Sequence, residues 1–213
     1  MPLNELKQVL KYAKPLEYKD GGAWYVIANK NIHDIADRYD IAFEKAAGIV
    51  AVLSPSVEWD MNLKDANEFI RLKGRHTCRT YGHNVRTARR ILRAKSASTV
   101  FKIIAGLQGF KVRAFFDNLV NPLSSVLITI DTHLIRAWYG TPFLTRVQLS
   151  AGFRRVLYSE ISRDVISIAD RLNMRPLDLQ AVLWVTWKKI APFKKSAALG
   201  QGYFEALLQG GQP

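Results

Sequence analysis

The chain has little cysteine and no long apolar segment. Its 213 residues include one cysteine, Cys78. This excludes an internal disulfide, and it excludes an iron–sulfur or zinc site built from the thiolates of one chain, because each needs several thiolates. No run of about 18 apolar residues occurs, and the first residues lack the apolar core of a secretion signal. We therefore expect a protein of the reducing cytoplasm, without a metal, a cofactor or a membrane partner.

Acidic residues are absent from Phe69 to Phe116, although this stretch carries twelve basic residues: Arg71, Lys73, Arg75, Arg79, Arg86, Arg89, Arg90, Arg93, Lys95, Lys102, Lys111 and Arg113. The whole chain has 31 Lys and Arg against 18 Asp and Glu, a net charge of +13. A stretch of one sign repels itself in a compact fold, so it predicts a polyanionic partner that neutralises it. The alternative is a solvated basic face that serves only solubility.

The hydrophobic pattern predicts one helix after another, with Gly or Pro at the breaks and almost no alternation of period two. We expect a helix at about 23–39, after Asp20-Gly21-Gly22, and a fully buried helix at 46–53 that ends before Pro55. Further helices are expected at about 62–73, from Gly82, around 103–104, after Gly109, from Asp131, at 153–172 and at 176–190. The predicted fold class is all-α.

The segment GIVAVLSPSVEWDMN is the first of three that together resemble the helix-hairpin-helix DNA glycosylases, typified by endonuclease III and the adenine and oxoguanine glycosylases. In that family a buried helix ends in a Ser-x-Gln loop, which reaches into the gap left by a flipped base. Ser56 stands where the family often has glutamine. The resemblance implies that Ser56 and Trp59, both in this polar loop, contact the gap or the unstacked base.

The second segment, GLQGFKVRAFF, is similar to the family hairpin of consensus LPGVGxKxA. Gly109-Phe110-Lys111-Val112 matches its second half and puts Lys111 where bifunctional members have their nucleophilic lysine. The first half departs from the consensus, because Gly106 and Leu107 fall where Pro and Gly are expected. Such hairpins bind phosphate with backbone N–H groups and a helix N-terminus. We expect DNA contacts from Gly106, Gly109 and Arg113, and from Arg86 and Arg90 on the basic side of an earlier helix.

The third segment, TIDTHLIR, resembles the family's VDTHVxR segment and implies that Asp131 is the catalytic carboxylate, with His133 and Arg136 contacting DNA. Cleavage of an N-glycosidic bond builds oxocarbenium character on the sugar, which a carboxylate stabilises. In the lyase variant a neutral lysine forms a Schiff base, and β-elimination then cuts the strand. The target base must leave the stack for either reaction.

The resemblance further implies a two-lobed fold with a cleft that holds the site. A six-helix barrel would span 30–125 and end in the hairpin, and a second helical lobe would combine 1–29 with 126–213. LSPxxxWxxN and the later Trp184-Val185-Thr186-Trp187 suggest a small bacteriophage-type member without an iron–sulfur cluster. The expected function is excision of a damaged or modified base from duplex DNA by a monomer, with lyase activity if Lys111 attacks the sugar.

Each assignment has an alternative. Asp131 could serve only as a helix N-cap, Lys111 as a phosphate contact and His133 as a structural residue. Trp184 and Trp187, three residues apart, are expected in the core. Two other functions remain open at this stage: a phage enzyme that modifies a hypermodified thymine, and a non-catalytic DNA-binding protein on the same scaffold.

Overall fold

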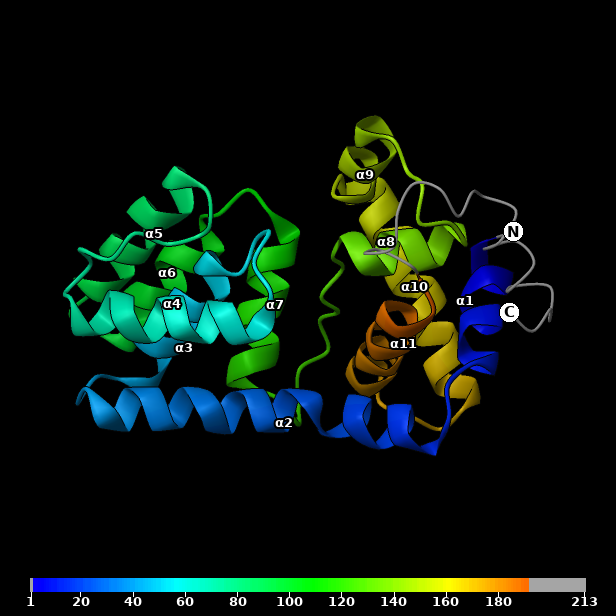
Figure 1. The fold of residues 1–213 in the computed structure, drawn as a ribbon, viewed down its shortest axis with the longest axis horizontal. Helices are drawn as coiled ribbons and strands as arrows, with labels where there is room; N and C mark the ends of the chain where they lie inside the picture. Colours follow the sequence, from blue (N-terminus) through cyan, green and yellow to red (C-terminus); the bar gives the residue numbers. More distant parts are fainter. Residues whose placement is uncertain (1, 192–213) are drawn as a thin grey trace. The chain divides into compact units, whose positions relative to one another are not determined.

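The computed structural model describes residues 2–191, which form α-helices and no β-strand, so the predicted all-α class is confirmed. Residues 192–213 of the expected second lobe lie outside the described residues. Within 2–191, every helix is too short or too polar to cross a lipid bilayer. Figure 1 shows the helices in chain order: α1 (Pro2–Lys11), α2 (Pro15–Arg38), α3 (Phe43–Leu53), α4 (Trp59–Arg71), α5 (Gly82–Leu92), α6 (Ala97–Ala105), α7 (Phe110–Val120), α8 (Thr132–Tyr139), α9 (Arg146–Gly152), α10 (Arg155–Arg171) and α11 (Pro176–Ile190).

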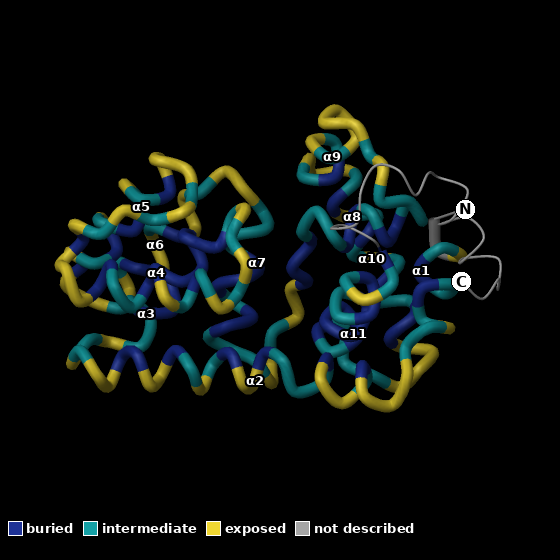
Figure 2. The backbone as a smooth tube through the Cα atoms, viewed as in Figure 1, coloured by how far each residue is buried: buried dark blue, intermediate teal, exposed yellow. Residues whose placement is uncertain are grey.

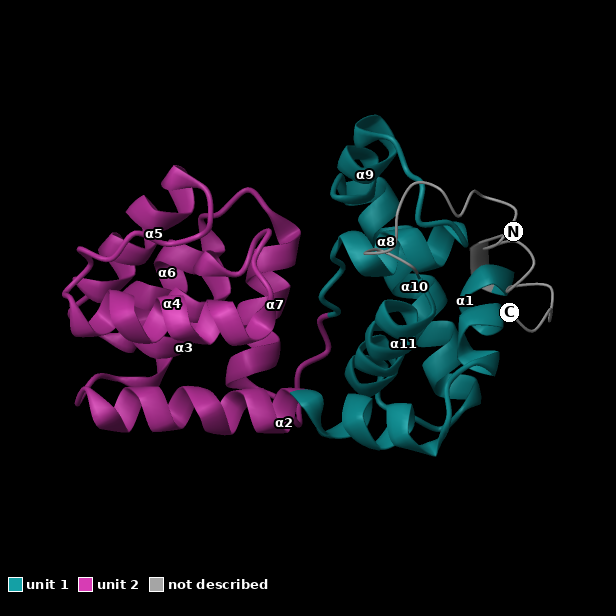
Figure 3. Ribbon diagram, in the orientation of Figure 1, with its two compact units in different colours: residues 1–24, 128–213 teal, residues 25–127 magenta. Residues whose placement is uncertain are grey.

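The chain divides into two compact units (Figure 3). Unit 1 comprises Met1–Trp24 and Ile128–Pro213, and unit 2 comprises Tyr25–Leu127. The chain passes from one unit to the other twice, once within α2 and once in the extended segment between α7 and α8. Unit 1 therefore contains α1, the start of α2 and α8 to α11, whereas unit 2 contains the rest of α2 and α3 to α7.

The core of unit 2 is built around α3, which packs against α4, α5, α6 and α7. Every residue of α3 from Ala46 to Leu53 is buried (Figure 2), as expected for a helix that is apolar on all sides. Polar side chains join the surrounding helices: Asn62 Nδ2 donates to Val50 O at 3.1 Å, and Asn29 Nδ2 donates to Leu119 O at 2.7 Å. The predicted buried helix is confirmed.

In unit 1, α8 packs against α1, α9 and α11, and α10 packs against α11. The side chains of Leu134, Ile135 and Trp187 are fully buried there. The hydroxyl of Tyr158 donates to Ile128 O at 2.7 Å and accepts the N–H of Ile130 at 3.1 Å. These two bonds fix the extended segment that leads into α8, and so they set where α8 begins.

The expected break at Gly21-Gly22 is wrong, because α2 runs through both glycines. A Cβ on Gly21 would lie 2.5 Å from the backbone nitrogen of Val182 in α11, closer than any side chain tolerates. Gly21 therefore allows two helices of unit 1 to touch rather than ending one of them. Two other bounds also differ: α4 begins at Trp59, and the helix expected at 153–172 is α10, preceded by the separate helix α9.

Candidate functional site

Asp131 lies at the start of α8 in unit 1, and both of its carboxylate oxygens are held in place. It is the N-cap residue: Oδ1 accepts the backbone N–H groups of His133 at 3.0 Å and Leu134 at 2.9 Å. The other oxygen, Oδ2, accepts the indole Nε1–H of Trp184 from α11 at 3.0 Å. The expectation that Asp131 begins a helix is confirmed, and the cap uses only one of the two oxygens.

Trp184 joins Asp131 to a small aromatic cluster in unit 1. Its ring makes edge contacts with the rings of Trp24, at 5.6 Å between centroids, and His133, at 6.3 Å. The ammonium of Lys188 lies 4.5 Å from its centroid. Sequence reasoning placed Trp184 in the core, yet it is only partly buried and hydrogen-bonds Asp131, whereas its neighbour Trp187 is a core residue. An indole N–H that is shielded from water needs an acceptor, but the sequence does not indicate an acceptor 53 residues away.

The remaining residues expected near Asp131 lie on α8. His133 occupies its first turn, and Arg136 follows three residues later with its side chain partly buried. Burial lowers the pKa of Arg136, and the negative charge of Asp131 acts in the opposite direction. The guanidinium keeps its charge, as arginine does in proteins. Unit 1 thus combines a fixed carboxylate and aromatic rings at the start of α8 with a partly desolvated guanidinium that belongs to its last turn.

In unit 2, the structure brings the first two sequence patterns together. Lys111, in the first turn of α7, donates from Nζ to Ser54 Oγ at 3.3 Å, and its Nζ lies 5.8 Å from the centroid of Phe115. Trp59 makes an edge contact with the same ring at 6.4 Å. Ser54 follows the last residue of α3, whose C-terminal carbonyl groups carry partial negative charge. A hydroxyl at the end of a helix and an aromatic ring therefore lie next to the amine of Lys111.

The loop between α3 and α4 is fixed to the segment that precedes α5. Ser56 is exposed, has a left-handed backbone (φ 64°), and pairs its hydroxyl with that of Tyr81 at 2.9 Å. Thr80 Oγ1 donates to Pro55 O at 3.0 Å. Tyr81 is 55% exposed and stacks on His83, a feature that sequence reasoning missed. The expectation that Trp59 is a loop residue is wrong, because it is the first residue of α4.

The turn Gly106–Gly109 joins α6 to α7 within unit 2. Gly106 caps α6 with φ −74° and Gly109 precedes α7 with φ −82°, so neither adopts the left-handed backbone. A Cβ on Gly109 would meet nothing within 4 Å, and Gly109 provides no side-chain cap for α7. The backbone at the start of α7 is therefore open to approach, which is the property a phosphate-binding turn needs. Arg113 follows on α7, with its guanidinium 4.7 Å from the ring of Phe110.

The arginines of the basic helix α5 differ in exposure and in role. Arg86 and Arg90 are exposed, as expected for residues that contact a partner. Arg89 is partly buried, and its Nε donates to Gly74 O at 2.9 Å. One arginine thus helps to hold the fold, while the exposed ones keep their charge at the surface.

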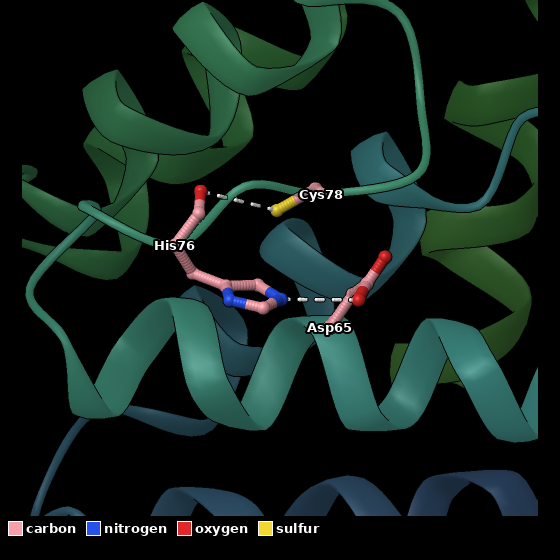
Figure 4. A group of neighbouring side chains, drawn as sticks. All are labelled: Asp65, His76 and Cys78. Atoms are coloured by element: carbon pink, nitrogen blue, oxygen red, sulfur yellow. Dashed lines mark hydrogen bonds and ion pairs between the residues drawn. The ribbon is translucent and has the colours of Figure 1, made fainter.

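A group of three side chains in unit 2 was not expected from the sequence: Asp65, His76 and Cys78 (Figure 4). One ligand atom from each lies within 4.8 Å of the others. The Asp65 side chain is only 2% exposed. Its Oδ2 accepts the backbone N–H of Arg79 at 2.8 Å, while Oδ1 pairs with His76 Nε2 at 3.1 Å and with Arg79 Nη1.

This donor set is one that zinc accepts, but the carboxylate is already in use. A metal at Oδ1 of Asp65 would have to displace the guanidinium of Arg79. Burial, followed by the charge of Asp65, raises the pKa of the Cys78 thiol to about 11, so the thiolate that a metal needs is scarce at neutral pH. We interpret the group as a buried anchor that fixes the segment between α4 and α5 through His76 and Arg79.

The described residues define an all-α protein made of two helical units, with a capped carboxylate in one and a basic surface in the other. The chain belongs to the Family of unknown function (DUF7178), whose model matches residues 3–191. No curated protein matches the chain, and no solved structure matches it.

Proposed function

We propose that the protein is a DNA N-glycosylase that removes a damaged or modified base, with Asp131 as its catalytic carboxylate. The observation that carries the proposal is the fixed position of Asp131 in the TIDTHLIR segment, held by two backbone N–H groups and by Trp184. A carboxylate that is oriented before the reaction stabilises the positive charge of the oxocarbenium-like transition state without a cost of reorganisation. It also orients the attacking water.

The basic surface of unit 2 supports DNA as the substrate. The stretch from Phe69 to Phe116 has no acidic residue, and Arg86 and Arg90 are exposed on α5. Phosphate contacts from such residues supply sequence-independent affinity. Within the proposal, the turn Gly106–Gly109 and Arg113 bind the backbone of the strand, and the exposed Ser56 loop occupies the gap left by the flipped base.

The finer fold belongs to the same proposal. Unit 2 holds most of α2 together with α3 to α7, and α6 and α7 are joined by a short turn with glycine at both ends. We propose that this unit is the helical barrel of a helix-hairpin-helix glycosylase and that unit 1 is its second lobe. Supporting observations are the buried helix α3, the short turn between α6 and α7 and the capped aspartate later in the chain.

For Lys111 we propose a phosphate contact, so the enzyme would be monofunctional. Attack on the sugar needs an amine that can reach the sugar carbon, whereas Nζ of Lys111 donates a hydrogen bond to the Ser54 hydroxyl and lies beside the Phe115 ring. Borohydride trapping on DNA with an abasic site distinguishes the two roles. We expect no covalent adduct; an adduct that is lost in Lys111→Gln would instead establish the bifunctional enzyme.

The test of the main proposal is base release. The protein is incubated with a panel of duplexes containing modified bases and with genomic DNA of phages that carry hypermodified bases, and free bases are identified by mass spectrometry. We expect one class of base to be released by the wild type and none by Asp131→Asn. Binding to DNA without release from any substrate would contradict the proposal and leave a DNA-binding protein.

A further inference from the structure

A pocket of about 710 Å³ lies in unit 2 where the ends of α2 and α4 meet the second half of α5. This volume is in the range of sites for small molecules, roughly 300 to 1,000 Å³. As far as the described residues go, the lining contains five basic side chains and no acidic one. Its members are Tyr39, Ile41, Ile70, Arg71, Lys73, Gly74, Arg75, Arg89, Leu92 and Arg93.

The five basic side chains differ in how far their charge is already balanced. Arg71 is paired with Glu68 through bonds of 2.5 to 3.2 Å, so its charge is compensated. Arg89 is fixed by its Nε–H bond to the backbone oxygen of Gly74, which leaves the charge of its guanidinium in the pocket. The other three (Lys73, Arg75 and Arg93) are exposed and form no ion pair with a carboxylate of residues 2–191.

Helix dipoles explain part of this accumulation of charge but not all of it. Basic residues favour helix C-termini, and α2, α4 and α5 all end near the pocket. Each helix end contributes about half a negative charge, or about 1.5 charges for three helices. Four uncompensated cations exceed this by about 2.5 charges. A dianionic phosphate group would neutralise most of the excess.

The lining also includes apolar side chains, those of Ile41, Ile70 and Leu92, and the aromatic side chain of Tyr39. The hydroxyl of Tyr39 donates to Asn67 Oδ1 at 3.2 Å, so the orientation of its ring is fixed. A flat ring of a ligand can therefore pack against an ordered surface while a charged group on the same ligand meets the basic side chains.

We propose that this pocket binds a nucleoside monophosphate, with its phosphate against Arg75, Arg89 and Arg93 and its base against Tyr39. Guanidinium groups match phosphate oxygens with paired hydrogen bonds, and the apolar and aromatic lining residues suit a base. The ligand is either a free nucleotide or the phosphorylated end of a DNA strand. This inference goes beyond base excision, since the pocket uses none of the residues assigned to that reaction.

The test compares thymidine 5′-monophosphate with thymidine by calorimetric titration of the full chain in buffer without phosphate. We expect the nucleotide to bind at least about tenfold more tightly than the nucleoside, because only the nucleotide carries a phosphate that forms charge-assisted hydrogen bonds with the guanidinium groups. The double variant Arg75→Gln/Arg93→Gln should lose at least about tenfold in nucleotide affinity. Arg154→Gln/Arg155→Gln removes the same charge from two exposed residues at the start of α10 in unit 1, and should change the nucleotide affinity less than about twofold.

Equal binding of nucleotide and nucleoside would overturn the proposal, as would equal losses in the two double variants, which would show a general effect of net charge. A comparison of short DNA with and without a 5′-phosphate identifies the source: a preference for the phosphorylated end assigns the pocket to strand ends, and no preference assigns it to free nucleotides. Base release is measured on the same variants. Nucleotide binding in a protein without excision activity would refute only the proposed function, and excision without nucleotide binding would refute only this inference.

Discussion

Replacement of Asp131 by serine separates the two roles that this residue can have. Serine is as good an N-cap as aspartate, so its hydroxyl can accept from the first turn of α8 as Oδ1 does now. It has no carboxylate, and it cannot reproduce the bond between Oδ2 and Trp184. Asparagine also keeps the cap, but its amide group would turn a donor toward the indole N–H of Trp184. Alanine removes both functions.

The expected losses of stability follow from these bonds. Loss of an N-cap costs about 1 kcal/mol, and loss of a hydrogen bond to a charged group costs about 1.5–3 kcal/mol. We expect Asp131→Ser and Asp131→Asn to lower the free energy of unfolding by about 1.5–3 kcal/mol, and Asp131→Ala by about 1 kcal/mol more. Removal of a group that stabilises transition-state charge lowers the rate by roughly 10²–10³. All three variants should therefore lose excision to a similar extent although their stabilities differ.

The assays are urea denaturation for stability, mass spectrometry for base release and fluorescence anisotropy for DNA affinity. Asp164→Asn is the matched control, because Asp164 accepts the indole N–H of Trp138 at 2.7 Å, also in unit 1. It should lose comparable stability and keep excision. If Asp131 were only a cap, excision would follow stability, and the serine variant would be as active as the control. That result would refute the catalytic assignment.

Four further predictions test the fold around the candidate sites. Gly21→Ala puts a Cβ 2.5 Å from a backbone nitrogen of α11 and should lower the free energy of unfolding by about 1–3 kcal/mol. Gly22→Ala is the matched control: its Cβ would meet nothing within 4 Å, so it should be neutral or stabilising. Thermal denaturation measures both effects. The hydrogen bond from Lys189 of α11 lowers the pKa of Glu17. The stability that Glu17 contributes is therefore present above pH 4.5 and is lost as the pH falls through the pKa of the folded state. The difference in melting temperature between wild type and Glu17→Gln should shrink from pH 5 to pH 3. Asp65→Asn should cost about 1–3 kcal/mol in urea denaturation, because it weakens a buried anchor. Cys78 has a pKa of about 11 against 9.0 for an ordinary thiol, so it should react with iodoacetamide roughly a hundredfold more slowly at pH 8. Chelation of divalent metals should leave the melting temperature of the protein unchanged. A fall in that temperature on chelation would mean that the group of Asp65, His76 and Cys78 binds a metal.

The sequence predicts the helices best where local chemistry decides them. The apolar run at 46–53, the proline that opens α11 and the cap at Asp131 all occur in the structure as expected. Local signals fail where a distant contact decides the outcome. Gly21 would usually mark a break, but its lack of a side chain is what lets α2 approach α11. A rule based on neighbouring residues cannot detect a partner at Val182.

The same limit applies to the candidate site. The resemblance of two local segments to the glycosylase patterns is what singles out Asp131 and Lys111. Their partners are distant in the chain: Trp184 is 53 residues from Asp131, and Ser54 is 57 residues from Lys111. Trp184 was expected in the core because an aromatic residue on an apolar helix usually lies there. The choice between core and site depends on which acceptor its N–H meets, and only the folded chain shows this.

The capping role of Asp131 and its proposed catalytic role support each other. A carboxylate offers about four acceptor positions, and the described residues use three of them, two at Oδ1 and one at Oδ2. One position on Oδ2 therefore remains for a water or a sugar. The cap fixes the direction of that position, because the amide groups of α8 and the indole of Trp184 prevent the carboxylate from rotating. On this reasoning Trp184→Phe, which frees Oδ2 but keeps the cap, should lower the rate of excision without a change in DNA affinity, and an unchanged rate would show that the cap alone is sufficient.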